Sequence, residues 1–191
     1  MENEDFQDIK IKSCPGVYYP AEDSWLLAKQ VRKYAFGRVL DMGTGSGIQG
    51  IIAAKKGCEV DFADKSQAAM ECASSNASMN HVHGRFILTD LFKNIHDKYN
   101  TIIFNPPYLP NEKVAKPDLS LDGGAGGREL ISKFIKAYPA HILQQNIILL
   151  VESSFNNYEK DASLLNAKIE KEHYFFEDIA VLIFGTMLEH S

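Results

Sequence analysis

Three glycines at alternate positions, Gly43, Gly45 and Gly47, follow the apolar run 39–42 and precede a segment typical of a helix. Glycine at such a strand-to-helix turn allows a tight bend and lets a ligand lie against bare backbone. The spacing G-x-G-x-G is a weak signal alone, and residues 45–50 also fit the dinucleotide pattern G-x-G-x-x-G. The anionic Asp41 suits a cation better than a pyrophosphate, and the loop contains no basic residue to hold a phosphate.

Apolar runs alternate with helical patterns along most of the chain, which indicates a parallel sheet covered by helices on both faces. The last two strands are separated only by the short segment 176–178, which predicts an antiparallel hairpin at the end of a seven-stranded α/β sheet. We predict strands at 38–42, 59–63, 85–88, 101–104, 146–151, 168–175 and 179–184, and helices after Glu22-Asp23 and at 48–56, 67–79 and 129–138.

The length of 191 residues fits one domain with a sizeable core, which we place at 17–191 behind a polar arm at 1–16. The net charge of -5 gives no overall attraction to nucleic acid. Three cysteines without a C-x-x-C pair fit a reducing cytosol better than a disulfide framework. The acidic N-terminus lacks the features of a signal peptide, and no apolar run is long enough to span a membrane, so we predict a cytoplasmic protein.

The tetrapeptide Asn105-Pro106-Pro107-Tyr108 follows an apolar strand and is suited to holding a planar NH2 group. The Asn105 side chain and the Pro106 carbonyl offer two acceptors, and the prolines stiffen the backbone that carries them. Tyr108 adds an aromatic face for stacking. A carboxamide or an exocyclic base amine would satisfy both acceptors, although an ordinary strand-ending turn explains the tetrapeptide alone about as well.

Two further carboxylates end predicted strands. Asp64 occupies the position where doubly wound folds bind the hydroxyls of a ribose, although it could also cap the next helix. Asp90 could accept a hydrogen bond from an adenine amino group, or serve as a plain turn residue. His81 and His83 are interpreted as exposed turn residues, and we predict no metal site.

These pieces together resemble the class I S-adenosylmethionine-dependent methyltransferases, and specifically the HemK/PrmC-type protein glutamine methyltransferases in their short archaeal and eukaryotic branch. The matching motifs occur in family order: residues 19–24, the loop 41–47, Asp64, residues 90–92, residues 105–108, and the glycine-rich stretch ending at 129. The resemblance implies a Rossmann-like fold and S-adenosylmethionine as cofactor. It also implies methylation of the glutamine in the Gly-Gly-Gln loop of a class 1 peptide release factor, with a small zinc-binding activator protein as a possible partner.

By this resemblance Asn105, Pro106 and Tyr108 would act on the substrate nitrogen. The residues implied in cofactor binding are Glu22, Ser24, Asp41, Gly43, Gly45, Gly47, Asp64, Asp90, Leu91 and Asn105. The alternative is a methyltransferase of RNA or DNA amino groups, which a basic rim formed by Lys113, Lys116 and Arg128 would favour. The long segment 109–127 is predicted to be a lid that orders when substrate enters.

Overall fold

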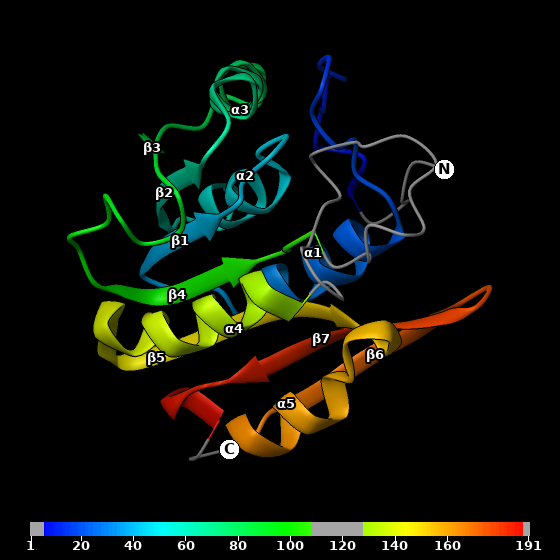
Figure 1. Cartoon of the computed structure of the whole chain (residues 1–191). Helices are drawn as coiled ribbons and strands as arrows, with labels where there is room; N and C mark the ends of the chain where they lie inside the picture. Colours follow the sequence, from blue (N-terminus) through cyan, green and yellow to red (C-terminus); the bar gives the residue numbers. More distant parts are fainter. Residues whose placement is uncertain (1–5, 108–127, 189–191) are drawn as a thin grey trace.

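A seven-stranded sheet forms the centre of the protein in a computed structural model that describes residues 6–107 and 128–188. The strand order is β3-β2-β1-β4-β5-β7-β6, and only β7 runs antiparallel to its neighbours. The arrowheads of β1, β2 and β4 point to one side of Figure 1 and that of β7 to the other. This arrangement confirms the predicted fold class. The strands are β1 (Arg38–Met42), β2 (Glu59–Asp64), β3 (Arg85–Leu88), β4 (Tyr99–Phe104), β5 (Ile142–Ser153), β6 (Lys168–Tyr174) and β7 (Glu177–Phe184).

Helices cover both faces of this sheet, as the apolar character of the central strands requires. One core cluster joins the sheet to α1, α2 and α3, and a second joins its opposite face to α4 and α5. The helices are α1 (Glu22–Tyr34), α2 (Ile48–Lys55), α3 (Gln67–Met79), α4 (Arg128–Ala137) and α5 (Tyr158–Leu165). Short 3-10 turns follow at Tyr138–His141, Ser154–Asn156 and Thr186–Leu188.

Two local predictions near the C-terminus differ from the structure. The helix α5 was not predicted, because its buried residues Tyr158, Asp161 and Ala162 include a charge that obscures the apolar pattern. The hairpin turn consists of Phe175 and Phe176, since Glu177 already pairs with Tyr174 in the ladder. The turn is therefore apolar. It begins one residue before the predicted segment 176–178 and ends at Phe176, two residues before the end of that segment.

The N-terminal residues from Phe6 onward pack against the domain. Phe6 is buried against Trp25, with ring centroids 5.6 Å apart. The backbone of Lys10 exchanges hydrogen bonds with the side chain of Asn80, and that of Lys12 does so with Asn76. The arm thus lies along α3 with its polar backbone groups satisfied, and its boundary at residue 16 stays a prediction.

The expectation that the cysteines form no disulfide is wrong. Cys14 on the arm is bonded to Cys72 on α3, with Cα atoms 6.0 Å apart and a sequence separation of 58. The odd cysteine count gave no signal of this pair, because only the return of the arm over α3 brings the two residues together. Cys58 remains a free thiol.

In the described ranges, 6–107 and 128–188, we find no helix with the length and apolar character needed to cross a lipid bilayer.

Candidate functional site

The predicted site residues gather at one edge of the sheet, where the parallel strands end. Met42 on β1 pairs with Ala63 on β2 and with Phe104 on β4. The residues that follow these positions, Gly43, Asp64 and Asn105, therefore leave the sheet side by side. Ligands of open α/β sheets bind at this carboxyl edge.

The glycine loop, residues 43–47, has the backbone that its sequence predicts. Gly43, Gly45 and Gly47 all have positive φ angles, 64°, 52° and 86°, which non-glycine residues rarely adopt. A Cβ on Gly47 would come within 3.1 Å of Ala73, so α3 approaches the loop closely. A Cβ on Gly45 would meet nothing nearer than 3.9 Å, so the space beside this residue is open to a ligand.

Asp41 lies beneath the glycine loop and holds its shape. Its Oδ2 accepts hydrogen bonds from the Thr44 hydroxyl at 2.6 Å and from the Gly50 backbone N–H at 2.9 Å. Burial raises the pKa of Asp41 to about 7. These contacts favour a positioning role for Asp41, which organises the loop from below.

Asp64 bridges two backbone segments. Its Oδ2 accepts from the Gly45 N–H at 3.0 Å and its Oδ1 accepts from the Ser66 N–H at 2.9 Å. The capping of α3 is performed instead by the Ser66 hydroxyl, which accepts from Ala69 N–H. Asp64 thus joins the glycine loop to the start of α3 while its side chain remains partly exposed.

The turn after β3 presents Asp90 and Leu91 at the same edge. Leu91 has a φ of 50°, and the Thr89 hydroxyl donates to its carbonyl at 2.9 Å, which fixes the turn. Asp90 is exposed and pairs with Lys93 at 2.6 Å. The hydrogen bond from Lys93 lowers the pKa of Asp90.

Asn105 is held in one orientation by a residue that the sequence analysis did not select. The Asn105 Nδ2 donates to Asp23 Oδ2 at 3.0 Å. An ionised carboxylate only accepts hydrogen bonds, so the NH2 group of the amide must face Asp23 and the carbonyl must face away. The Asn105 Oδ1 is buried and has no hydrogen-bond partner among the described residues. Such an atom is costly to leave unpaired, which marks it as an acceptor for a ligand.

Asp23 is itself buried and fixed, with 3% of its surface exposed. Its Oδ1 accepts from the Tyr18 hydroxyl at 3.1 Å and from Ser24, through the backbone N–H at 2.6 Å and the hydroxyl at 3.1 Å. The Ser24 hydroxyl is therefore hydrogen-bonded within the protein. Glu22 is exposed at the same end of α1. The sequence showed Glu22-Asp23 only as an acidic helix start, and burial of Asp23 became visible only in the fold.

Two amide side chains also support the site without having been predicted. Gln49 on α2 donates to the Ser24 carbonyl at 2.8 Å, which ties α1 to the helix that follows the glycine loop. Asn76 on α3 donates to the Ser46 carbonyl at 2.9 Å and also binds the arm at Lys12. An amide side chain close to the glycine loop was the available signal, but nothing in the sequence indicates which backbone carbonyl group it binds.

The rest of the tetrapeptide is described only in part. Pro106 is buried and directly follows Asn105. Tyr108, the segment 109–127, Lys113 and Lys116 lie outside the described residues.

Arg128 turns inward and binds within the protein. Its Nη2 contacts both carboxylate oxygens of Asp161 at 2.9 Å, and its Nη1 donates to the Asn156 carbonyl. Nη1 also lies 3.9 Å from the fully buried Glu152 on β5. Burial, followed by the nearby Asp161 carboxylate, raises the pKa of Glu152. A guanidinium paired in this way has less of its charge free for a nucleic-acid phosphate, which weighs against the basic rim considered above.

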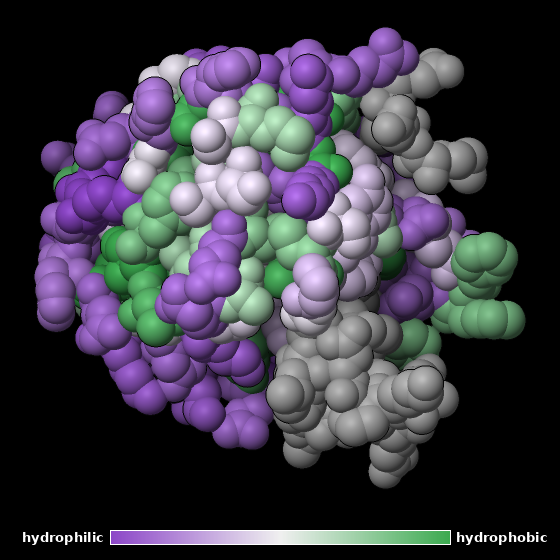
Figure 2. Space-filling model, turned by 90° about the horizontal axis from the view of Figure 1, so that it is seen from above, coloured by the Kyte–Doolittle hydropathy of each residue, from purple (hydrophilic) through white to green (hydrophobic). Residues whose placement is uncertain are grey.

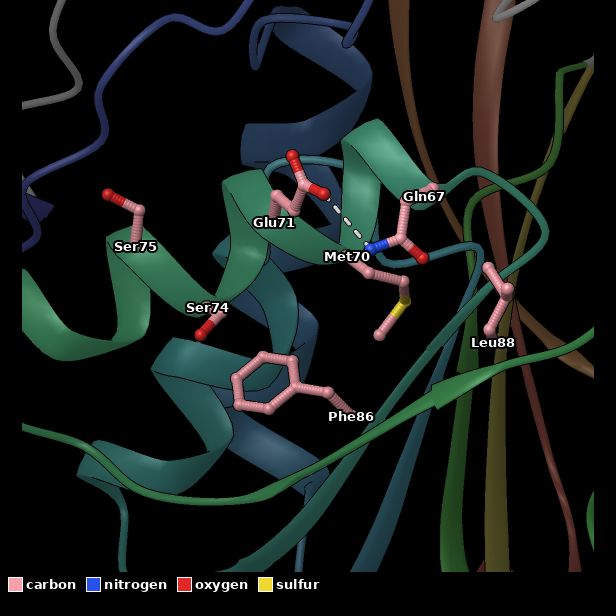
Figure 3. Close-up of a pocket in the computed structure, with 7 residues that line it drawn as sticks. All are labelled: Gln67, Met70, Glu71, Ser74, Ser75, Phe86 and Leu88. Atoms are coloured by element: carbon pink, nitrogen blue, oxygen red, sulfur yellow. Dashed lines mark hydrogen bonds between the residues drawn. The ribbon is translucent and has the colours of Figure 1, made fainter.

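A separate hollow of about 520 Å³ lies between α3 and the free edge strand β3 (Figure 3). Met70 from the helix and Phe86 and Leu88 from the strand give it an apolar wall, and a Gln67–Glu71 hydrogen bond of 3.0 Å lies above it. The hollow is outside the glycine loop and the Asn105 region. In the part of the chain that the structure describes, no three His, Cys, Asp or Glu side chains are grouped to hold a metal ion.

Comparisons with known proteins agree with this geometry. The putative protein N5-glutamine methyltransferase of Methanocaldococcus jannaschii is 36% identical over 84% of this chain and 84% of its own length. The ribosomal RNA small subunit methyltransferase C of Hamiltonella defensa is 30% identical over 81% of this chain, which spans only 44% of that protein. The structure of the E. cuniculi Mtq2-Trm112 complex, responsible for methylation of the eRF1 termination factor, matches with a TM-score of 0.70 at 22% identity. That match covers 88% of this chain and 97% of that chain.

The family described as the methyltransferase small domain matches residues 8–174, which include the glycine loop, Asp64 and Asn105. The chain belongs to the methyltransferase small domain family.

Proposed function

We propose that this protein transfers the methyl group of S-adenosylmethionine to the side-chain amide nitrogen of a glutamine, in the Gly-Gly-Gln loop of a class 1 peptide release factor. The observation that carries this proposal is the buried Oδ1 of Asn105, which has no hydrogen-bond partner among residues 6–107 and 128–188 and whose amide is fixed by Asp23. The relative named for protein N5-glutamine methylation, which this chain spans almost end to end, supports the same substrate class.

The residues at the carboxyl edge fit S-adenosylmethionine. The open space beside Gly45 would be filled by a side chain on any other residue, and a ligand can lie there against bare backbone. Asp64 is partly exposed beside that space and would hold the ribose hydroxyls, with Asp90 and Leu91 at the adenine. Asp41, beneath the glycine loop, would place a carboxyl group near the cationic methionine end, and this group carries its negative charge above about pH 7. Glu22, exposed at the start of α1, would cover the cofactor, while the buried Ser24 would act through its hydrogen bond to Asp23.

The bound cofactor would supply a methyl group already activated by the sulfonium. The amide nitrogen of glutamine is a weak nucleophile, so the protein must position it and relieve its developing positive charge. Asn105 Oδ1 and the Pro106 carbonyl would accept the two N–H bonds and aim the nitrogen at the methyl carbon. The cofactor would supply the methyl group and leave as its demethylated thioether, and the proton lost from the nitrogen would pass to water. Tyr108 would stack on the planar amide.

A nucleic-acid amino group has the same two donors, so Asn105 alone does not exclude it. The inward pairing of Arg128 and the net charge of -5 favour a protein substrate. We propose that the protein acts in the cytoplasm, where release factors work.

We propose further that a small zinc-binding activator protein adds to the free edge of β3. Among the strands that the structure describes, β3 has a neighbour on one side only, and its residues Phe86 and Leu88 are 37% and 49% exposed. An open edge with exposed apolar side chains is a ready surface for strand addition. The Mtq2 protein of the matching structure is itself in complex with Trm112. Replacement of Leu88 by Lys should prevent copurification with such an activator and leave S-adenosylmethionine binding to the chain alone unchanged.

The proposed function is tested by labelled methyl transfer from S-adenosylmethionine to release factor, tRNA, ribosomal RNA and DNA, each with and without the activator. We expect label on release factor alone, and its loss when the loop glutamine is replaced by asparagine. Label on a nucleic acid and none on release factor would replace the proposal with the alternative function.

A further inference from the structure

Two phenylalanines form the turn between β6 and β7, and we call this pair the hairpin tip. Phe175 is 90% exposed and Phe176 is 91% exposed, whereas the next large apolar side chain among the described residues, Leu164, is 72% exposed. Hydrophobic residues stand out from the rim of Figure 2 on the side where Figure 1 places this hairpin. An adjacent pair of exposed aromatic rings lowers solubility and adds nothing to the core.

The backbone conformation of the turn does not explain why two phenylalanines occur there. Phe175 has a φ of 49°, in the left-handed region that glycine, asparagine and aspartate prefer. A two-residue hairpin turn normally carries one of these residues at such a position. A bulky side chain is unfavourable there, so neither packing nor turn geometry accounts for Phe175.

The hairpin tip lies at the same edge of the molecule as Asn105. Ile179 on β7 pairs with Ser153 at the carboxyl end of β5, so the turn before β7 extends beyond that edge (Figure 1). Tyr174 at the base of the hairpin packs against the core cluster that includes Leu26 and Leu27 of α1, and α1 contacts β7. The base of the hairpin is therefore close to α1, which carries the carboxylate that orients Asn105.

The hairpin is held firmly behind its tip. Asp178 accepts from Lys171 at 2.7 Å and lies 2.7 Å from the His173 ring nitrogen. Its backbone N–H donates to the Ser154 hydroxyl at 3.1 Å, which fastens the hairpin to the end of β5. A rigid support lowers the entropy lost when the exposed rings bind a partner.

From this placement we propose that the hairpin tip is a second docking point for the protein substrate, inserting Phe175 and Phe176 into an apolar pocket on the substrate away from its reacting loop. The inference rests on the proposed function, because it assigns the tip to the same substrate. Three carboxylates, Glu172, Glu177 and Asp178, lie within three residues of the tip. Glu172 and Asp178 are paired with Lys29 and Lys171, and the hairpin 168–184 contains four carboxylates against two lysines, so it has no excess of positive charge to attract a nucleic acid or an anionic membrane. Its position at the carboxyl edge of the sheet favours the protein substrate as the occupant.

The test compares the double variant Phe175→Asn, Phe176→Ser with wild type, using intact release factor as substrate. We expect KM for release factor to rise at least about tenfold, as loss of aromatic anchors does at interfaces. The value of kcat should stay within about twofold, and the Kd of S-adenosylmethionine should not change. The melting temperature should stay equal or rise, because asparagine suits the φ of Phe175.

Leu164→Ser is the matched control, since this exposed residue lies at the end of α5 near the opposite edge of the sheet, and it should leave KM unchanged. An unchanged KM in the double variant would overturn the docking role. A wild-type dimer that becomes monomeric in the double variant would also overturn it, by showing that the tip joins two copies of this chain. Absence of methyl transfer to release factor by wild type would instead overturn the proposed function, so the two failures are distinguishable.

Discussion

The two halves of the carboxyl edge differ in how their side-chain oxygen atoms are hydrogen-bonded. In the cofactor half, formed by the glycine loop with Asp41 and Asp64, the carboxylates bind backbone N–H groups of the chain itself. In the substrate half, formed by Asn105 with Asp23, the Asn105 carbonyl oxygen is buried without a hydrogen-bond partner among the described residues. The cofactor half is thus organised by the protein alone, while Asn105 requires a ligand to complete its hydrogen bonding.

The largest effect should come from removing that unpaired acceptor. Asn105→Ala should lower turnover on the order of a hundredfold or more, because a preorganised contact is lost as the transition state forms. The affinity for S-adenosylmethionine should change little, since Asn105 acts mainly in the substrate half. Single-turnover rates and calorimetric titration measure the two quantities. A variant with near-normal single-turnover rates would remove Asn105 from the mechanism.

A smaller effect, on the affinity for S-adenosylmethionine and not on turnover, is expected in the cofactor half. Asp64→Ala should weaken S-adenosylmethionine binding by roughly tenfold to a hundredfold, the range for loss of a charged hydrogen-bond partner. It removes the acceptor for Gly45 and Ser66 as well as the proposed ribose contact. Glu71→Ala removes the same charge from an exposed position on α3 and should leave the affinity unchanged. Equal calorimetric affinities for Asp64→Ala and wild type would contradict the cofactor assignment.

The link between the halves is Asp23, which fixes the Asn105 amide. Asp23→Asn should reduce kcat by about tenfold, because a neutral partner no longer dictates which end of the amide faces the substrate. The affinity of Asp23→Asn for S-adenosylmethionine should equal that of wild type. Glu129→Gln, an exposed carboxylate on α4, serves as the control. If kcat were unaffected while the protein remained folded, the orientation of Asn105 would not depend on Asp23.

The smallest effect concerns stability and pH. The pKa of Asp41 is raised to about 7 in the folded protein, against an ordinary value near 3.9. The neutral acid is therefore favoured by folding, and its contribution to stability is present below about pH 4 and is lost as the pH rises through about 7. The melting temperature of wild type relative to Asp41→Asn should fall across this window and stay constant above it. Parallel melting curves for the two proteins between pH 4 and pH 8 would show that Asp41 does not titrate there.

Local patterns predicted the elements of the sheet because most of the strands are separate apolar runs; the exception is β6, which is mostly polar. Strands β1 and β3 and helix α3 have the predicted bounds. Strand β5 is longer than the predicted 146–151 at both ends, because the polar Gln144 and Gln145 separate Ile142 and Leu143 from the apolar run and the polar Glu152 and Ser153 follow it. The glycine loop was also predictable, because positive φ angles demand glycine at fixed positions.

Contacts between distant residues could not be predicted in the same way. Asp23 and Asn105 are 82 residues apart, and their hydrogen bond exists only because α1 packs beside the end of β4. The Cys14–Cys72 bond and the Arg128–Asp161 pair likewise depend on how the arm and α5 pack. The sequence contained every one of these residues, but pairing is a property of tertiary structure.

The Cys14–Cys72 bond makes a covalent ring of the chain between these residues, which contains α1, the glycine loop and Asp64 and excludes Asn105. A ring of this size restricts the unfolded chain and stabilises the folded state by roughly 4 kcal/mol in the chain-entropy description. A single peptide-bond cut inside the ring would leave the two pieces covalently joined, whereas a cut in 73–191 would release a fragment. Limited proteolysis followed by electrophoresis without reductant would therefore distinguish cuts between residues 14 and 72 from cuts beyond residue 72.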